Sequence, residues 1–167
     1  MVFEGTLGNY KETDDRFPST AYGEMKKFVE DYLFDSNKPF LIVRLSKLYS
    51  RDHKDTSFIQ EIKKKLASGQ IVSAACDQFV NMIEVKEAAS VITLLLQQKH
   101  SGVFHIAGPE TLTRHAIACR IATTINALDQ IKTCSIEDFN FKEPRPKNNT
   151  LNTDKIRKEL NIEFSKF

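Results

Sequence analysis

A short apolar run, FLIVRLS at residues 40–46, constrains the fold more than any other stretch of this sequence. It is rich in aliphatic and β-branched residues and lacks the polar alternation of a half-exposed strand. Such a run is typical of a strand that is buried on both faces of a parallel sheet. Because parallel strands need long crossover connections, usually helices, the run predicts an α/β architecture.

The rest of the chain fits that expectation, because strand and helix patterns alternate along it. Further strands are predicted at 70–76, at 102–108 and in the stretch IKTCSI that begins at residue 131. Helices are predicted from Ser19 or Thr20 to Leu33, in SFIQEIKKKLASG from residue 57, at 85–98, from Thr111 or Thr113 to Leu128, and at 153–160. Residues 1–21 are expected to form an ordered loop, because glycine, asparagine, aspartate and proline are frequent there.

Three of the predicted helices have an expected buried apolar face. In SFIQEIKKKLASG it consists of Phe58, Ile59, Ile62 and Leu66. In the first helix we expect Phe28, Val29 and Leu33 to face a core. In the fourth helix the apolar positions from Ile117 to Leu128 are expected to do the same.

Length and charge exclude several classes of protein. A chain of 167 residues is long enough for one domain with a real core, and its net charge of +2 is close to balance. The basic clusters at 63–65 and 142–147 have no interleaved aromatic residues, so we expect no nucleic-acid partner. The longest apolar run, at 91–96, is far too short to cross a membrane, and we expect no membrane association.

The cysteines and the first residues of the sequence indicate a cytoplasmic protein. Cys76, Cys119 and Cys134 lie far apart without metal-ligand spacing, which is typical of reduced thiols, and we expect no metal site. The first ten residues lack the basic and apolar regions of a signal peptide.

Tyr22 and Lys26 form the most informative pair of polar residues. Four residues apart on a predicted helix, they share one face and are close enough to interact. A free tyrosine has a pKa near 10, but an ammonium group about 4 Å away favours the phenolate by about 4 kcal/mol at an effective dielectric constant of about 20. The lysine is therefore expected to lower the tyrosine pKa into the range of general acid catalysis. The spacing alone also arises by chance, since lysine is abundant here.

Five motifs in a fixed order give this pair its context. They are AYGEMK from residue 21, LIVRLSKLYS from 41, ACDQF from 75, GVFHIAGPE from 102 and PRPKNNTLNTDKI from 144. No single motif is specific, but the ordered set resembles the dTDP-4-dehydrorhamnose reductases, a family of extended short-chain dehydrogenase/reductases. The resemblance spans nearly the whole chain and covers the carboxy-terminal half of that family.

The resemblance implies a role for each of five residues. Tyr22 would be the general acid that protonates the C4 oxygen of a 4-keto sugar nucleotide while NADP or NAD, in reduced form, delivers a hydride. Lys26 would hold the nicotinamide ribose and depress the tyrosine pKa. Asp77, Gln78 and Arg145 would lie on the sugar-nucleotide side, where an arginine can bind a pyrophosphate with two hydrogen bonds.

Plainer interpretations compete with some of these roles. Without the resemblance, Arg145 is equally well explained as a solvent-exposed loop cation, and Asp77 with Gln78 as an ordinary turn. His105, in the middle of a predicted strand, is expected to be a structural histidine. Arg44, inside an apolar strand, is expected to pair with another side chain rather than bind a ligand.

The sequence also departs from the family pattern. None of its six glycines follows the G-x-x-G-x-x-G spacing of a dinucleotide fingerprint, so we expect no cofactor to bind this chain alone. The serine or threonine that completes the catalytic group would fall at Met1. Lys47 occupies the position of a family tryptophan, Ser50 that of a glycine, and FVNMI from residue 79 differs from the family's Y-G-x-P-T segment.

We therefore expect one α/β domain over 1–167, made of a partial Rossmann sheet and a small α/β substrate-binding lobe. Residues 1–50 would be the remnant of the Rossmann domain that carries the tyrosine–lysine pair, and 51–167 mainly the lobe. The strand at 40–46 would then have an exposed edge, which favours self-association or pairing with a separately encoded nucleotide-binding half.

The expected function is that of a truncated dTDP-4-dehydrorhamnose reductase, in deoxysugar and surface-polysaccharide synthesis, with little or no activity of its own. Its substrate would be a sugar nucleotide. One alternative is a non-catalytic regulatory module that is similar to the beta subunit of methionine adenosyltransferase. A fragment of a sugar-nucleotide epimerase or dehydratase is a further alternative.

Overall fold

The computed structural model describes residues 2–52 and 58–167 and confirms the α/β class. In chain order the helices and strands are α1 (Ala21–Asp35), β1 (Leu41–Leu45), β2 (Lys47–Tyr49), α2 (Phe58–Ala67), β3 (Val72–Ala75), β4 (Phe79–Glu84), α3 (Val85–Gln97), β5 (Gly102–Ile106), β6 (Thr111–Thr113), α4 (Arg114–Thr123), β7 (Ile131–Cys134) and α5 (Asp154–Leu160). Short 3-10 turns lie at Leu128–Gln130 and Ile136–Asp138.

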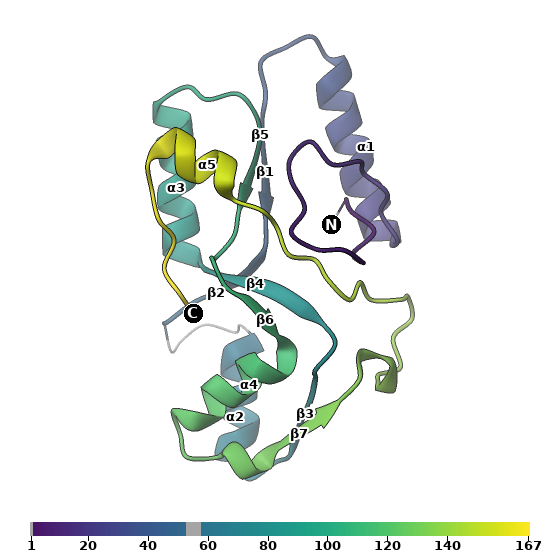
Figure 1. The fold of residues 1–167 in the computed structure, drawn as a ribbon, viewed down its shortest axis with the longest axis vertical. Helices are drawn as coiled ribbons and strands as arrows, with labels where there is room; N and C mark the ends of the chain where they lie inside the picture. The colour runs from purple at the N-terminus through teal and green to yellow at the C-terminus, as the bar shows by residue number, and fades with distance from the viewer. Residues whose placement is uncertain (1, 53–57) are drawn as a thin grey trace.

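The first part of the fold is a parallel strand pair between helices. β1 pairs with β5 in the register Leu41 with Gly102 through Leu45 with Ile106. Figure 1 shows α1 on one side of this pair and α3 with α5 on the other. We call these five elements the β1/β5 layer. Its apolar core lies on the α3 side and consists mainly of Ile83, Ala88, Val91, Leu95, Phe104, Ile106, Ile156 and Phe164.

β1 is half-buried rather than buried on both faces. Only Ile42 and Arg44 of this strand are buried. In the described part of the chain β1 pairs with β5 alone, so its other edge carries no strand. The unpaired edge that the sequence predicts is therefore present among the described residues.

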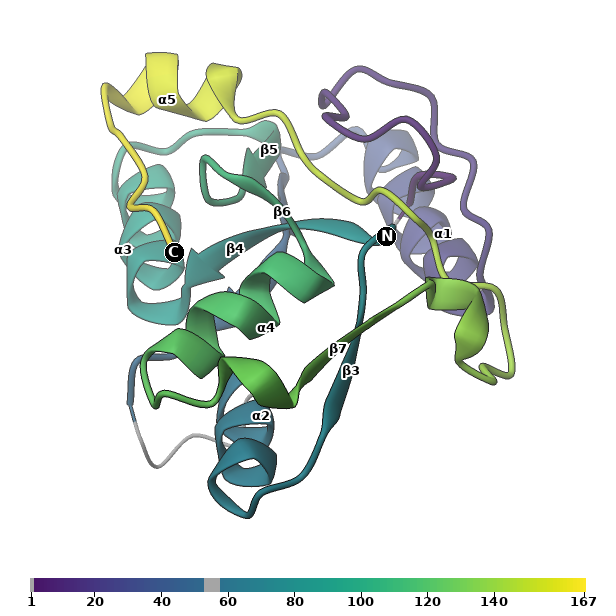
Figure 2. The same ribbon diagram turned by 60° about the horizontal axis from the view of Figure 1, so that its bottom comes forward.

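The second part of the fold, which we call the α2/α4 lobe, contains two further small sheets. β3 and β7 are parallel, from Val72 with Ile131 to Ala75 with Cys134, which confirms both predicted strands. β4 lies between parallel β2 and antiparallel β6, and these three strands were not expected from the sequence. α2 and α4 cover the sheets, as Figure 2 shows. The predicted division of the chain at residue 50 stays a prediction.

The predicted inward face of α1 is wrong. Phe28 is 73% exposed and Val29 is 53% exposed, whereas the buried residues of this helix are Gly23 and Glu30. The physical reason lies in β1, which presents a charged Arg44 to the helix. α1 therefore packs through a carboxylate, Phe28 and Val29 point outward, and Leu33, the third residue of the predicted face, is half-buried.

α4 is shorter than its apolar spacing predicts. It begins at the expected cap, because the Thr113 hydroxyl accepts a hydrogen bond from the Ala116 amide at 3.0 Å. It ends at Thr123, and Asn126 then adopts a left-handed backbone with φ of 53°. This turn carries Leu128 out to the surface, where it is 52% exposed.

The N-terminal loop is joined to the segment that precedes α5, and we call this contact the terminal junction. The Asn148 amide donates to the Gly5 carbonyl at 2.7 Å, and the Asn9 amide donates to the Thr150 hydroxyl at 2.7 Å. Gly5 has a φ of +83°, and a Cβ there would lie 2.1 Å from Cβ of Pro146, so only glycine fits. Both views place this loop beside the segment.

Candidate functional site

The tyrosine–lysine pair lies at the start of α1, as the sequence predicts. The Thr20 hydroxyl caps the helix by accepting from the Gly23 amide at 3.1 Å, which puts Tyr22 in the first turn and Lys26 one turn later. The Lys26 ammonium lies 5.4 Å from the centroid of the Tyr22 ring. The two side chains therefore contact each other on one helix face, and the ring remains 61% exposed.

This pair opens onto a cavity of about 350 Å³ at the free edge of β1. The cavity is lined by Val2, Tyr22, Lys26, Glu30, Val43, Arg44 and Leu45. It therefore combines a phenol and an ammonium group with one apolar wall. A carbonyl group that enters it can meet the tyrosine hydroxyl, which is the geometry that general acid catalysis requires.

A buried ion pair forms the floor beneath that cavity. The Arg44 guanidinium donates to both Glu30 carboxylate oxygens, at 2.9 Å and 2.7 Å. Its Nη1 lies 3.1 Å from His105 Nε2, and Nδ1 of the same ring lies 3.0 Å from the Tyr10 carbonyl oxygen. Because Arg44 can only donate and the carbonyl can only accept, His105 is neutral with its proton on Nδ1. Arg44 and His105 are thus structural residues, as predicted.

Burial and the neighbouring guanidinium set the pKa of His105. Desolvation disfavours the charged ring, and the positive charge of Arg44 disfavours it further, so the pKa falls from 6.5 to about 4. The ring therefore stays neutral at physiological pH. It acts as a fixed acceptor that orients Arg44 below the tyrosine–lysine cavity.

Gln78 lies at a second cavity, of about 410 Å³, between α2, β3 and the turn after β7. Its side-chain amide donates to the Pro146 carbonyl at 3.1 Å, and its oxygen accepts from Arg114 Nε at 3.1 Å. The aromatic rings of Phe58, Phe139 and Phe141 also line this cavity. A cavity with aromatic walls and a guanidinium group can bind a nucleotide through stacking and charge.

Arg114 was missed from the sequence, although a physical signal for it exists. It is the first residue of α4, where the positive end of the helix macrodipole makes a cation unfavourable. Burial and the nearby charge of Arg145 both lower the pKa of the Arg114 guanidinium. Helix stability therefore does not explain a cation at this position.

Arg145 reaches the same region from the loop that follows β7. Its guanidinium carbon lies 5.1 Å from the Phe141 ring centroid, beside an adjoining cavity of about 340 Å³. The structure thus brings Gln78 and Arg145 to one place, with Arg114 between them. Arg145 is exposed, and in the described residues no carboxylate lies within 4.0 Å of it.

Asp77 points toward a neighbouring turn instead of the cavity. Its carboxylate accepts from the Ser135 hydroxyl and from the Ile136 amide, both at 2.7 Å. These hydrogen bonds stabilise the charged form, so the Asp77 pKa lies below its usual value. Asp77 therefore anchors the 3-10 turn after β7, and Ile136 of this turn lines the second cavity.

The N-terminal loop connects the two cavities. The Ser19 hydroxyl, just before α1, donates to the Glu4 carbonyl at 3.1 Å. The next residue of the loop, Gly5, contacts Pro146, whose carbonyl holds Gln78. A second connection runs along the chain from Leu45, which lines the first cavity, to Lys47, which contacts Phe58 of the second. The cavities are therefore held in a fixed relation.

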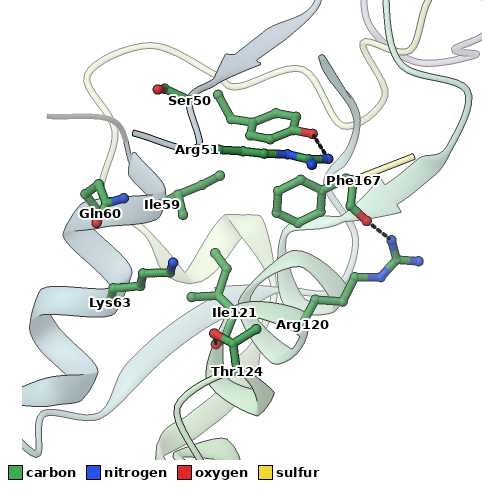
Figure 3. A pocket seen from close by; sticks show the side chains of 10 residues that line it. Ser50, Arg51, Ile59, Gln60, Lys63, Arg120, Ile121, Thr124 and Phe167 are labelled. Atoms are coloured by element: carbon green, nitrogen blue, oxygen red, sulfur yellow. Dashed lines mark hydrogen bonds between the residues drawn. The ribbon is translucent and has the colours of Figure 1, made fainter. Parts of the chain in front are cut away.

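A further cavity, of about 300 Å³, lies between α2 and α4 and is shown in Figure 3. Its walls include Ile59, Ile121 and Phe167, with Arg51 and Arg120 at its rim. Arg120 already donates two hydrogen bonds to the Glu110 carboxylate, at 2.9 Å each, and a third to the Phe167 carbonyl at 3.1 Å. None of the predicted site residues lines this cavity, and it carries no part of the argument below.

The described residues contain neither a cluster of metal ligands nor a helix that could cross a membrane. Among residues 2–52 and 58–167, no group of three or more histidine, cysteine or acidic side chains is arranged to hold a metal ion. Over the same residues, no helix combines the length and apolar character needed to span a bilayer.

Comparison with known proteins identifies the family. The model of the RmlD substrate binding domain matches residues 1–167. The chain belongs to this family. The probable low-salt glycan biosynthesis reductase Agl14 of Haloferax volcanii is 30% identical over 165 residues, which are 95% of this chain and 55% of that protein. The beta subunit of methionine adenosyltransferase 2 of Rattus norvegicus is 28% identical over 163 residues, which are 93% of this chain and 48% of that protein.

Solved structures share the fold of this chain. The structure of dTDP-4-dehydrorhamnose reductase from Bacillus anthracis, in complex with NADP, superposes with a TM-score of 0.89 at 21% sequence identity. The superposition covers 99% of this chain and 58% of that chain. The chain thus spans about half the length of the curated relatives it matches, and it has the fold expected for the carboxy-terminal half of an extended short-chain dehydrogenase/reductase.

The described residues fit only one end of a nicotinamide dinucleotide. At the nicotinamide end, Lys26, which lies beside Tyr22, is the residue that would hold the ribose. The pyrophosphate needs a glycine-rich turn at a helix N-terminus. Gly5 and Gly8, the glycines of the N-terminal loop, instead pack against Pro146 and Asn148. The cradle for the pyrophosphate is therefore not built from the described part of this chain.

Proposed function

We propose that this chain supplies the substrate-binding lobe and the tyrosine–lysine pair of a reductase that acts on a 4-keto sugar nucleotide in deoxysugar and polysaccharide synthesis. The single observation that carries the proposal is the contact between Tyr22 and Lys26 in a cavity that opens at the free edge of β1. Membership of the RmlD family and the nucleotide-sized cavity at Gln78 support it.

The proposed chemistry assigns a proton transfer to this chain. Reduced NADP or NAD, held by a nucleotide-binding half, would supply the hydride that the sugar C4 carbon needs. The Tyr22 hydroxyl gives its proton to the C4 oxygen, and the carbonyl becomes a hydroxyl. The Lys26 ammonium offsets the negative charge left on the phenolate. Gln78, Arg114 and Arg145 hold the nucleotide end of the substrate.

The proposal includes a partner, because the chain lacks a pyrophosphate cradle among its described residues. A nucleotide-binding half, on the same polypeptide or encoded separately, would add its strands to the free edge of β1. Tyr22 and Lys26 lie at that edge, so the added strands would bring the nicotinamide to them. The 167 residues by themselves are then expected to reduce no substrate.

A reconstitution assay tests the proposal. The chain is mixed with a nucleotide-binding half, and oxidation of NADPH is followed with dTDP-4-dehydro-6-deoxyglucose as substrate. We expect turnover only from the mixture, and a loss of about 10²- to 10⁴-fold for Tyr22→Phe. Tyr32→Phe, which removes an exposed phenol from the same helix, is the control and should keep full activity. Normal turnover by the chain alone, or by Tyr22→Phe, would contradict the proposal.

A second function is favoured by the outer face of α1. Its exposed apolar side chains, and the 28% identity to a methionine adenosyltransferase beta subunit, support a non-catalytic subunit. Sedimentation of the chain with a purified methionine adenosyltransferase catalytic subunit separates the two functions. A stoichiometric complex that survives Tyr22→Phe but not Phe28→Asp would favour the regulatory function, and no complex would disfavour it.

A further inference from the structure

Two neighbouring lysines of α1 each have an acid four residues later, but only one of them is paired with it. Lys27 forms an ion pair with Asp31 at 2.8 Å. Glu30 follows Lys26 at the same interval, and both side chains line the cavity of Tyr22. In the described part of the chain, however, no carboxylate oxygen lies within 4.0 Å of Lys26 Nζ. Helical spacing alone therefore does not explain why the Lys26 ammonium lies against the Tyr22 ring rather than at Glu30.

The carboxylate of Glu30 is instead occupied by a guanidinium from β1. Arg44 Nε donates to Oε1 at 2.9 Å, and Arg44 Nη2 donates to Oε2 at 2.7 Å. Arg16 adds a longer contact to Oε2, at 3.3 Å. A planar guanidinium that binds both oxygens is a stronger partner for a carboxylate than an ammonium, which acts as a single point of charge. Glu30 is therefore satisfied without Lys26.

Arg44 is also fixed by contacts outside α1. It is buried in β1, and its Nη1 lies 3.1 Å from Nε2 of His105, its partner in the paired strand β5. Its guanidinium carbon lies 5.0 Å from the centroid of the Phe3 ring. Arg44 therefore loses little further side-chain freedom when it binds Glu30. This favours the buried pair over an exposed pair in which two mobile side chains must be ordered.

A carboxylate without this partner would oppose the chemistry proposed for the tyrosine. It would attract the Lys26 ammonium away from the phenol. By its own charge it would also disfavour the phenolate that remains after proton transfer. When Glu30 is bound to Arg44, the guanidinium balances its charge, and the ammonium stays beside Tyr22.

We propose that Arg44 is a positioning residue, which keeps Glu30 away from Lys26 and so leaves the Lys26 ammonium free to serve Tyr22. In this role Arg44 acts through Glu30 and not on the substrate. The inference rests on the proposed function, because it concerns the same tyrosine–lysine pair. The contact between Lys26 and Tyr22 can nevertheless be measured without any turnover.

Nuclear Overhauser effects in the full 167-residue chain test the inference. The parent should give a cross-peak between side-chain protons of Lys26 and ring protons of Tyr22. Arg44→Met should lose this cross-peak, because Oε1 of Glu30 is released and can pair with Lys26. Glu30→Gln combined with Arg44→Met should restore it. Both variants lack the guanidinium and they differ in one carboxylate, so reduced stability cannot explain the difference.

A surface variant makes the same test where Arg44→Met does not fold. Val29 is exposed and lies three residues after Lys26, so Val29→Glu places a second acid within reach of the ammonium. This variant should lose the cross-peak. In the reconstituted enzyme its kcat should fall at least about tenfold, with an unchanged KM for the sugar nucleotide. Val29→Gln has nearly the same shape without the charge, and as the matched control it should behave like the parent.

The outcomes separate the inference from the proposed function. A cross-peak that persists in folded Arg44→Met or in Val29→Glu would overturn the inference, and so would its loss from the double variant. Equal kcat for Val29→Glu and Val29→Gln would do the same. A reconstituted parent without turnover, in which the cross-peaks respond as expected, would overturn the proposed function alone. Absence of the cross-peak from the parent would overturn both.

Discussion

Two arginine clusters in this molecule look alike in composition and differ in partners. In the β1/β5 layer, Arg44 lies 5.0 Å from the Phe3 ring centroid and is held by Glu30 and His105. In the α2/α4 lobe, Arg114 lies 5.0 Å from the Phe58 ring centroid and faces other cations. The first cluster neutralises its own charge with a buried carboxylate, and the second, at a cavity, has no carboxylate within 4.0 Å among the described residues. The difference separates a charge that is paired within the fold from one that is not.

The largest expected effect comes from breaking the neutralised cluster. Glu30→Gln removes the acid from a buried pair and leaves Arg44 uncompensated, so unfolding should require about 3–5 kcal/mol less. Urea denaturation followed by circular dichroism measures the change. The exposed pair of Glu61 with Lys65 provides the control, and Glu61→Gln should change stability by less than about 0.5 kcal/mol. Similar losses for both variants would contradict the distinction.

The free energy of unfolding should depend on pH through His105, which contacts Arg44 in the neutralised cluster. The folded pKa of His105 is about 4 and the unfolded value is 6.5, so the unfolded chain binds the extra proton between these two values. The contribution of His105 is therefore fully present above pH 6.5 and is lost as the pH falls toward 4. The loss should amount to about 3 kcal/mol. Denaturation at pH 7 and pH 4.5 measures it, and His105→Gln should remove most of the difference between the two pH values.

Removing the guanidinium should cost much less stability in the cluster around Arg114 than in the cluster around Arg44. Arg44→Met leaves Glu30 buried without its partner and should cost about 3–5 kcal/mol. Arg114→Met removes a cation that repels its neighbours, although it also loses its contact with Phe58, and stability should stay within about 1 kcal/mol of the parent. A loss from Arg114→Met as large as that from Arg44→Met would show that both clusters serve the fold.

The smallest effect on stability is expected at the outer face of α1. Phe28 is 73% exposed, so Phe28→Asp should change the free energy of unfolding by less than about 0.5 kcal/mol. It should, however, weaken self-association, which sedimentation velocity at high concentration can detect. A parent chain that stays monomeric at high concentration would contradict the prediction that this face and the β1 edge associate.

Features of this molecule that depend on local sequence patterns could be predicted, whereas contacts between distant residues could not. The tyrosine–lysine contact depends on helical periodicity alone, so the four-residue spacing of Tyr22 and Lys26 predicted it correctly. β1 and β5 were recognised because apolar runs are local signals. The orientation of α1 was not recognised, since it depends on the pairing of Glu30 with Arg44, which lie in different elements. Long-range polar contacts leave no periodic trace in a sequence.

The β2–β4–β6 sheet of the α2/α4 lobe was missed for a related reason. β4 contains Asn81, and its amide oxygen accepts from the Leu151 backbone at 2.7 Å, across 70 residues of sequence. A buried amide that serves a distant backbone breaks the apolar pattern of a strand. Arg114 and Phe58 escaped notice as site residues because a cavity joins them from separate helices.

The terminal junction has a consequence for how the protein is made. Its hydrogen bonds join residues that are up to 141 positions apart, and Tyr10 with Leu151 forms a bridge between them. Such contacts cannot form until the segment around residue 150 has been synthesised and has left the ribosome. Residues 2–10 therefore stay without these partners while the intervening residues are made, and the loop that joins the two cavities is fixed late in folding.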